Sequence, residues 1–271
     1  MIGRVSRWPG LTISMWLVAA AAGAQAAATP QAPFEPKVGQ AGKDVVWVPT
    51  PQALVDKMLD MAKVTPQDYL IDLGSGDGRT VITAARRGVR ALGIEYNPDM
   101  VELARRNAAA ANVADKATFV KADIFESDFS KATVITLFLL PQLNLKLRPT
   151  LLGLAPGTRI VSNSFTMDDW QPDETATVTE GCTTWCTALF WVVPAKVEGT
   201  WRVGDQDLVL TQQFQKLSGS LGGTPITDGA MRGSEMTFTA GGAKYTGHVA
   251  GNAIQGTVVG GRASTWSATR R

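Results

Sequence analysis

The chain has 271 residues, of which 45% are hydrophobic and 18% are charged, so it can bury one large core or two smaller ones. Its 26 basic residues nearly balance its 24 acidic residues, which argues against a protein that binds nucleic acid electrostatically. The chain has two cysteines and a single histidine, His248, which excludes a metal site built from four nitrogen and sulfur ligands.

The first 26 residues are typical of a secretory signal. Arg4 and Arg7 precede an alanine-rich apolar stretch at residues 11–23, and the sequence AQA at residues 24–26 matches a signal-peptidase site. Cleavage would remove two of the 26 basic residues and leave them equal in number to the acidic ones. We therefore expect export, most simply to the periplasm, with no stable membrane span after cleavage. An uncleaved membrane anchor is the alternative, although a spanning helix needs roughly 20 strongly apolar residues.

Residues 27–44 are rich in proline, glycine and alanine and predict a linker, with the fold starting near Val45. From there to residue 194, apolar runs alternate with helical patterns. The strand-like runs are residues 69–73, 90–95, 117–123, 133–140 and 158–165, and the helix-like segments are residues 51–62, 79–88 and 98–113. These runs are nearly continuous in apolar residues, as is typical of strands buried on both faces, so the pattern predicts an α/β domain with a parallel sheet wrapped by helices.

Residues 195–271 have a different texture, in which glycines punctuate short segments of alternating apolar residues at intervals of roughly ten residues. This pattern predicts a small all-β domain, an antiparallel meander that closes into a barrel or sandwich. The pattern does not distinguish a structural cap from a module that binds a substrate or partner, because any meander needs glycine turns and alternating apolar residues.

A glycine-rich turn follows the first predicted strand in the sequence YLIDLGSGDGR. Gly74, Gly76 and Gly78 lack a Cβ atom, which permits positive φ and close approach of a ligand. The GxGxG spacing differs from the GxGxxG dinucleotide fingerprint. Asp72 and Asp77 would repel a diphosphate and would suit a cation. S-adenosyl-L-methionine fits this requirement, because it has no phosphate and carries an ammonium and a sulfonium.

The stretch DLGSGDG closely resembles motif I of the class I SAM-dependent methyltransferases, and the resemblance extends over residues 46–194. It implies a Rossmann-like sheet that is parallel except for an antiparallel last strand. It also implies that Glu95 accepts both ribose hydroxyls, that Asp123 accepts from the adenine amino group, and that Thr50 caps the first helix. The full set of cofactor-binding residues that it implies is Thr50, Asp72, Gly74, Ser75, Gly76, Asp77, Gly78, Glu95, Tyr96, Asp123, Ile124 and Phe125.

The end of the fourth strand is where the reacting group usually lies in this family. Here it reads LFLLP, with Phe138, Leu140 and Pro141 as candidates for the pocket wall. Many amino-group methyltransferases carry Asn/Asp-Pro-Pro-Tyr at this place, so its absence argues against methylation of nucleic-acid bases or glutamine. The segment is more similar to the ATP synthase c-subunit lysine methyltransferase family and its bacterial relatives. An apolar wall would favour a neutral, nucleophilic lysine, but the same residues could equally belong to the sheet core.

The resemblance leaves the methyl acceptor open between a protein lysine and a small molecule. The main alternative is an exported SAM- or nucleoside-binding protein without turnover, whose β-domain binds partners. In an oxidising compartment we expect Cys182 and Cys186 to form a disulfide, with two free thiols as the alternative, and their spacing argues against a redox role because it is not CxxC. The resemblance places this pair in the hairpin that ends the sheet.

Overall fold

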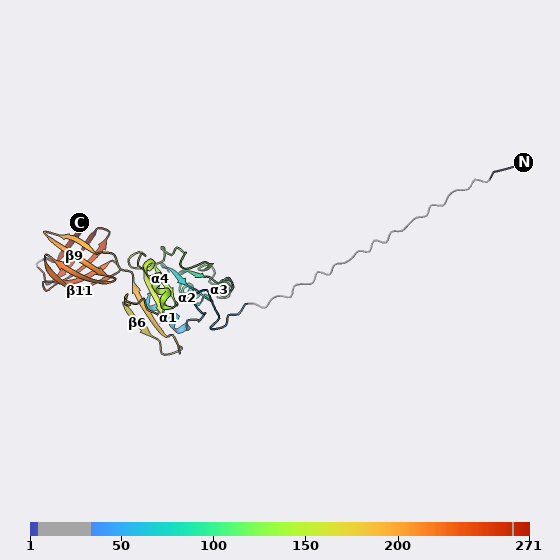
Figure 1. Ribbon diagram of the computed structural model, residues 1–271, viewed down its shortest axis with the longest axis horizontal. Coiled ribbons are helices and arrows are strands. Elements are labelled where there is room, and N and C mark those ends of the chain that lie inside the picture. Colours follow the sequence, from blue (N-terminus) through green and yellow to red (C-terminus); the bar gives the residue numbers. More distant parts are fainter. Residues whose placement is uncertain (5–33, 262) are drawn as a thin grey trace. The chain divides into compact units, whose positions relative to one another are not determined.

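The computed structural model describes residues 1–4, 34–261 and 263–271 (Figure 1). The chain divides into one unit of residues 1–33 and another of residues 34–271, and the second unit contains all the helices and strands described below. Apart from residues 1–4, the expected signal segment lies outside the described residues. None of the helices in the described part is both long and apolar enough to cross a membrane.

A seven-stranded sheet forms the first part of the fold, with the strand order β3-β2-β1-β4-β5-β7-β6. Its strands are β1 Tyr69–Leu73, β2 Arg90–Glu95, β3 Ala117–Lys121, β4 Val134–Leu137, β5 Arg159–Asn163, β6 Glu174–Thr177 and β7 Thr187–Val192. β1 to β5 are parallel, whereas β7 runs antiparallel to β5 and pairs with β6. This arrangement confirms the predicted Rossmann-like sheet with an antiparallel end.

Helices cover both faces of this sheet: α1 Gln52–Met61, α2 Arg79–Arg86, α3 Pro98–Ala110 and α4 Pro141–Leu151. Neighbouring strand residues point to opposite faces. Leu70 packs in a core with α1, α2 and α3, and Ile71 packs in a second core with α4. Because both faces are covered, the central strands need apolar residues at nearly every position, as their sequences show.

The first helix begins differently from the sequence-based expectation. Pro51, not Thr50, is the N-cap residue of α1, and no side chain caps this end. The Thr50 side chain is buried, and its hydroxyl accepts a hydrogen bond from Asn163 Nδ2 at 3.3 Å. The predicted capping role is therefore wrong, because the hydroxyl is engaged with the end of β5.

The fold also begins earlier than Val45. The Trp47 amide donates to the Gln40 carbonyl at 2.9 Å, and the Gly39 amide donates to the Trp47 carbonyl at 2.9 Å. Ala41 and Val46 form an isolated antiparallel bridge. The described end of the expected linker is thus a hydrogen-bonded turn, which the sequence did not indicate because it has no apolar periodicity.

The strands after residue 195 form a closed antiparallel barrel in the order β10-β11-β12-β13-β14-β15-β8-β9. They are β8 Gly199–Val203, β9 Gln206–Gln213, β10 Lys216–Leu221, β11 Thr224–Arg232, β12 Glu235–Ala240, β13 Ala243–Ala250, β14 Ala253–Val259 and β15 Thr265–Arg270 (Figure 1). Trp201, Met236 and Phe238 lie in its core. The predicted meander is confirmed as a barrel, which leaves no open sheet edge.

Candidate active site

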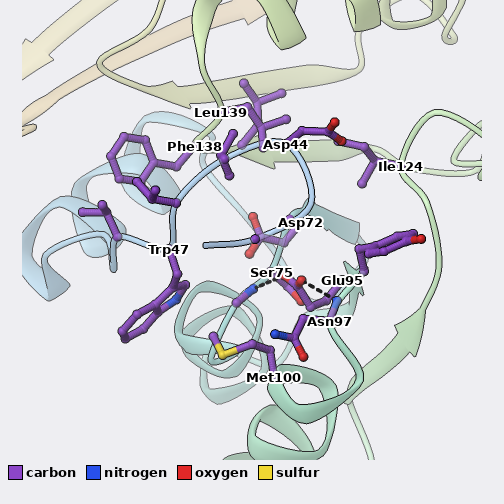
Figure 2. A pocket seen from close by; sticks show the side chains of 18 of the residues that line it. Asp44, Trp47, Asp72, Ser75, Glu95, Asn97, Met100, Ile124, Phe138 and Leu139 are labelled. Atoms are coloured by element: carbon purple, nitrogen blue, oxygen red, sulfur yellow. Dashed lines mark hydrogen bonds between the residues drawn. The ribbon is translucent and has the colours of Figure 1, made fainter. Parts of the chain in front are cut away.

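A pocket of about 230 Å³ lies where the carboxyl ends of β1, β2 and β4 meet. This edge of an open α/β sheet is the usual place for ligands, because the loops that leave the strands diverge there. The turn at residues 40–47 forms a further wall. In Figure 2, Asp72 and Glu95 point toward the middle of the pocket, with Phe138 and Leu139 on one side and Met100 on the other.

Two glycines of the predicted turn shape this pocket directly. Gly74 and Gly76 have φ values of +80° and +53°, in the region that favours glycine. A Cβ atom on Gly76 would lie 2.7 Å from Trp47 Nε1, so a side chain there would displace the pocket wall.

Glu95, at the end of β2, is held by two backbone amides. Its Oε2 accepts from Gly76 N and its Oε1 accepts from Asn97 N, both at 2.9 Å (Figure 2). A carboxylate offers about four acceptor positions, so both oxygens keep capacity for a diol. The two amides fix the orientation of Glu95 before any ligand arrives.

Asp72, at the end of β1, is 6% exposed and accepts a hydrogen bond from the Thr136 hydroxyl at 2.7 Å. Burial raises the pKa of Asp72 from 3.8 to about 7; the Thr136 hydrogen bond opposes this shift, and the charges of Glu95 and Asp77 add to it. A carboxyl in this state gains most from a ligand that brings a positive charge.

Asp77 lines the pocket but is already paired. Arg79 Nη2 donates to Asp77 Oδ2 at 2.6 Å, and Arg79 Nη1 donates to the Thr50 carbonyl at 2.9 Å. The negative charge available to a cationic ligand therefore comes mainly from Asp72 and Glu95, and Asp77 ties the glycine turn to the loop before α1.

Asp123 lies beyond β3 and forms an ion pair with Lys43 of the opposite wall. The hydrogen bond from Lys43 is the largest cause of a lowered pKa of Asp123, and the Phe125 amide, which donates at 2.9 Å, adds to it. The Lys43 ammonium also lies 4.9 Å from the centre of the Tyr96 ring. Ile124, next to Asp123, lines the same part of the pocket.

Three predicted site residues do not line the pocket. Gly78 instead permits packing, because a Cβ atom there would lie 2.7 Å from the Phe119 ring. The Phe125 ring packs in the core on the α4 face, with Lys146 Nζ 3.6 Å from its centre. Pro141 is the first residue of α4 and is exposed. Phe138 and Leu140 do line the pocket, as expected.

Other lining residues were not predicted, among them Lys43, Trp47, Met100, Phe165 and Trp185. They come from segments far apart in the chain, which no local motif connects. Only the position of Trp185 could have been suspected from the sequence, because this residue lies between the two cysteines that were expected to form a disulfide. The predicted Cys182–Cys186 disulfide is present, in the connection between β6 and β7.

The residues around the acidic half of the pocket fit a cofactor with an ammonium, a ribose and an aromatic base. Glu95 can accept from a diol, and Ile124 and Met100 supply apolar surface for a flat ring. The Ser75 hydroxyl is buried against Gly93 of β2 and has no hydrogen-bond partner in the described part of the chain. The two cations among the described residues that line the pocket, Lys43 and Arg79, are already paired with Asp123 and Asp77. A lining of backbone amides and carboxylates suits S-adenosyl-L-methionine better than a diphosphate.

Several known proteins are similar in sequence to the part of the chain that forms this site. Residues 72–174 match the model of the ANTKMT methyltransferase domain. A protein-lysine N-methyltransferase of Saccharolobus islandicus is 44% identical over 140 residues, which are 51% of this chain and 87% of that protein. The ATP synthase c-subunit lysine N-methyltransferase of Mus musculus is 35% identical over 130 residues, 48% of this chain and 52% of that protein.

A crystal structure of an RNA methyltransferase from Salinibacter ruber, in complex with S-adenosyl-L-homocysteine, is also similar. It is 51% identical, covers 55% of this chain and 96% of its own, and has a TM-score of 0.52. The Saccharolobus relative is matched over most of its length, and the pocket offers what the cofactor requires. The chain therefore belongs to the ANTKMT methyltransferase family and is an S-adenosyl-L-methionine-dependent methyltransferase.

Proposed function

We propose that the methyl acceptor is the side-chain amine of a protein lysine. The observation that carries this proposal is the apolar wall of the pocket at the end of β4, where Phe138, Leu139 and Leu140 stand side by side in the chain. This wall offers no side-chain carboxylate or amide to hold a nucleobase or a glutamine amide. The names of the Saccharolobus and Mus relatives, both lysine N-methyltransferases, support the same acceptor.

Burial is the chain's main contribution to the chemistry of such an acceptor. The cofactor supplies a methyl carbon that its sulfonium activates. Transfer forms the N–C bond as the C–S bond breaks, with the electron pair of that bond staying on sulfur. The amine must therefore be neutral when it attacks. An apolar wall disfavours the ammonium form and lowers the pKa of the entering amine, and its proton leaves to water, so no dedicated base is required.

RNA is the competing acceptor, because the Salinibacter structure is named as an RNA methyltransferase. With 26 basic and 24 acidic residues, this chain has a positive excess of only two charges, which is little to hold a polyphosphate. A small amine is the remaining candidate. Labelling of cell extracts separates these three classes of acceptor.

We also propose that the protein works outside the cytoplasm. The basic, apolar and small-residue order of residues 1–26 and the Cys182–Cys186 disulfide support export, because disulfides persist in oxidising compartments. A membrane-anchored form is the alternative.

The test is methyl transfer from tritiated S-adenosyl-L-methionine to membrane and periplasmic extracts. We expect label that protease releases and RNase does not, in a product that acid hydrolysis identifies as methyl-lysine. Asp72→Asn should reduce labelling at least tenfold, whereas Val259→Ala on the exposed barrel surface should not. Label that RNase removes would assign RNA, and label in a small molecule would assign a free amine.

A further inference from the structure

Three aromatic side chains meet at the mouth of the pocket, each from a different connection. Phe138 follows β4, Phe165 follows β5, and Trp185 lies between β6 and β7. The ring centres are 5.9 Å apart for Phe138 and Phe165, 6.2 Å for Phe138 and Trp185, and 4.9 Å for Phe165 and Trp185. All three line the pocket that also holds Asp72 and Glu95. We call them the aromatic trio.

Trp185 occupies a position that costs stability, so folding by itself does not explain its placement. Its side chain is 45% exposed, although tryptophan is one of the largest apolar side chains. Its backbone has a φ of +57°, a region that costs energy for a residue with a Cβ atom. Unfavourable backbone at a pocket is a common mark of a functional position.

The structure holds the trio in place from two sides. The Cys182–Cys186 disulfide closes the short loop that contains Trp185, with Cα atoms 5.8 Å apart. The Phe165 carbonyl accepts from the Ser162 hydroxyl at 2.8 Å and from Asn144 Nδ2 at 3.1 Å. These contacts fix the backbone of both residues, so the rings can meet a ligand without further ordering.

Phe138 and Phe165 stack at an interplanar angle of 20°, and both rings are tilted against Trp185, so the faces left for a ligand are those turned away from these contacts. Among the residues that the structure describes, lysine and arginine side chains lie over other aromatic rings, such as Phe125 and Phe214, and over none of the trio. Aromatic faces attract ammonium groups, most strongly when these are desolvated. An amine that gains a methyl group becomes positively charged, and an aromatic face beside it stabilises that charge as it develops.

From these observations we infer that the aromatic trio is the site that takes the amine-bearing side chain of the acceptor, and that the Cys182–Cys186 disulfide positions Trp185 in it. This inference rests on the proposed function, since it assumes that a lysine amine enters from this side. It adds a specific contact residue, Trp185, and makes acceptor binding dependent on an oxidised loop.

The test follows Trp185 itself by ¹⁹F NMR of 5-fluorotryptophan-labelled protein saturated with S-adenosyl-L-homocysteine. The Trp185 signal is assigned as the one missing in Trp185→Phe. The probes are N-acetyl-trimethyllysine amide, which mimics the charged product, and N-acetyl-norleucine amide, which has no charge. We expect the trimethyllysine probe to shift the Trp185 signal in a saturable way and the norleucine probe to leave it in place at the same concentration.

Variants of Trp185 and reduction of the disulfide then distinguish a direct contact with the probe from an effect on folding. Trp185→Ala should weaken the trimethyllysine probe at least tenfold, measured by calorimetry, and Trp185→Phe should retain most of the binding. Reducing the disulfide of the wild-type protein should weaken the same probe several-fold. S-adenosyl-L-homocysteine should bind all these forms equally, because none of the changes touches the acidic half of the pocket.

Equal shifts with both probes, or none with either, would overturn the inference, as would equal probe affinity before and after reduction. Loss of S-adenosyl-L-homocysteine binding in Trp185→Ala would also overturn it, since the residue would then be structural. The inference and the proposed function fail separately. If tritium enters protein lysine but Trp185 does not respond, only the trio assignment is wrong; if tritium enters RNA or a free amine, the lysine proposal is wrong.

Discussion

The Thr136 hydroxyl donates a hydrogen bond of 2.7 Å to Asp72 Oδ1, and the two residues face each other across β1 and β4. This pair puts a carboxyl group into the interior of the sheet, next to the carboxylates of Glu95 and Asp77. Its single hydrogen-bond donor does not offset the cost of burial, and the pKa of Asp72 rises to about 7. Asp72 is therefore a buried acid whose protonation should change near neutral pH.

The first prediction concerns stability. Because the folded-state pKa of Asp72 is raised from 3.8 to about 7, the folded protein holds a proton that the unfolded chain releases between these values. The stability that Asp72 contributes is fully present below pH 3.8 and is lost as pH rises toward 7. Asp72→Asn should therefore raise the free energy of unfolding at pH 8 by about 1–3 kcal/mol, with a smaller gain at pH 5.

Urea unfolding at both pH values measures this difference. Asp205→Asn, in the exposed turn between β8 and β9, is the matched control and should change stability little at either pH. A gain for Asp72→Asn that is the same at pH 5 and pH 8 would show that Asp72 does not titrate in this range.

The second prediction uses the same acid for cofactor binding. A ligand ammonium near Asp72 favours the ionised carboxyl group, so binding at pH 6 should release a proton. Calorimetry of S-adenosyl-L-homocysteine in buffers of different ionisation enthalpy should show this release at pH 6 and little of it at pH 8. Asp72→Asn should abolish the difference, and proton uptake in the wild-type protein would contradict the assignment.

The third prediction concerns Glu95. Removing a charged hydrogen-bond acceptor costs roughly 1–3 kcal/mol, so Glu95→Ala should weaken S-adenosyl-L-homocysteine binding by that amount. Glu102→Ala, on the exposed face of α3, serves as the control. NAD should bind neither protein detectably. An unchanged affinity in Glu95→Ala would remove the ribose role, and NAD binding more tightly than S-adenosyl-L-homocysteine would overturn the pocket assignment.

Local sequence patterns located the sheet well. Tyr69–Leu73 and Arg90–Glu95 were predicted with the bounds that the structure has, because each is a mainly apolar run that ends at a turn or a charged residue. α4, Pro141–Leu151, was not predicted. Pro141 and Pro149 argue against a helix in the sequence, yet the first occupies the N1 position, where proline is tolerated, and the second lies near the C-terminal end.

The pocket was predicted only where its residues follow one another in the chain. The glycine turn, Glu95 and Asp123 follow strand ends, so their neighbourhood follows from parallel pairing. Lys43 and Phe165 reach the same pocket from a turn and a loop, and their positions depend on long-range contacts, of Lys43 with Asp123 and of Phe165 with Phe138 and Trp185. No periodicity or motif encodes such contacts.

The fourth prediction concerns the disulfide in the cell. Mass spectrometry of the exported protein should show Cys182 and Cys186 linked and the mature chain starting at Ala27. Alkylation without reductant should label neither cysteine. Two alkylated thiols, or a chain that starts at Met1, would contradict export through a cleaved signal.

The fifth prediction concerns the barrel. Every described residue that lines the pocket lies between Gln40 and Trp185, so a truncation after Lys196 should bind S-adenosyl-L-homocysteine with nearly native affinity. It should melt at a lower temperature, because it loses the stacking of Phe214 on Trp170, whose ring centres are 6.0 Å apart. Activity on a large acceptor should fall if the barrel selects the substrate. A folded truncation that cannot bind the cofactor would show that the barrel completes the pocket.

The lysine amine as methyl acceptor is tested most directly by comparing tritiated methyl transfer to two dialysed samples of the same extract, which retain no small amines, one with lysine amines blocked by acetylation and one mock-treated. We predict that acetylation abolishes labelling while S-adenosyl-L-homocysteine binding by the enzyme stays unchanged. Equal labelling of the blocked and mock-treated samples would contradict the account.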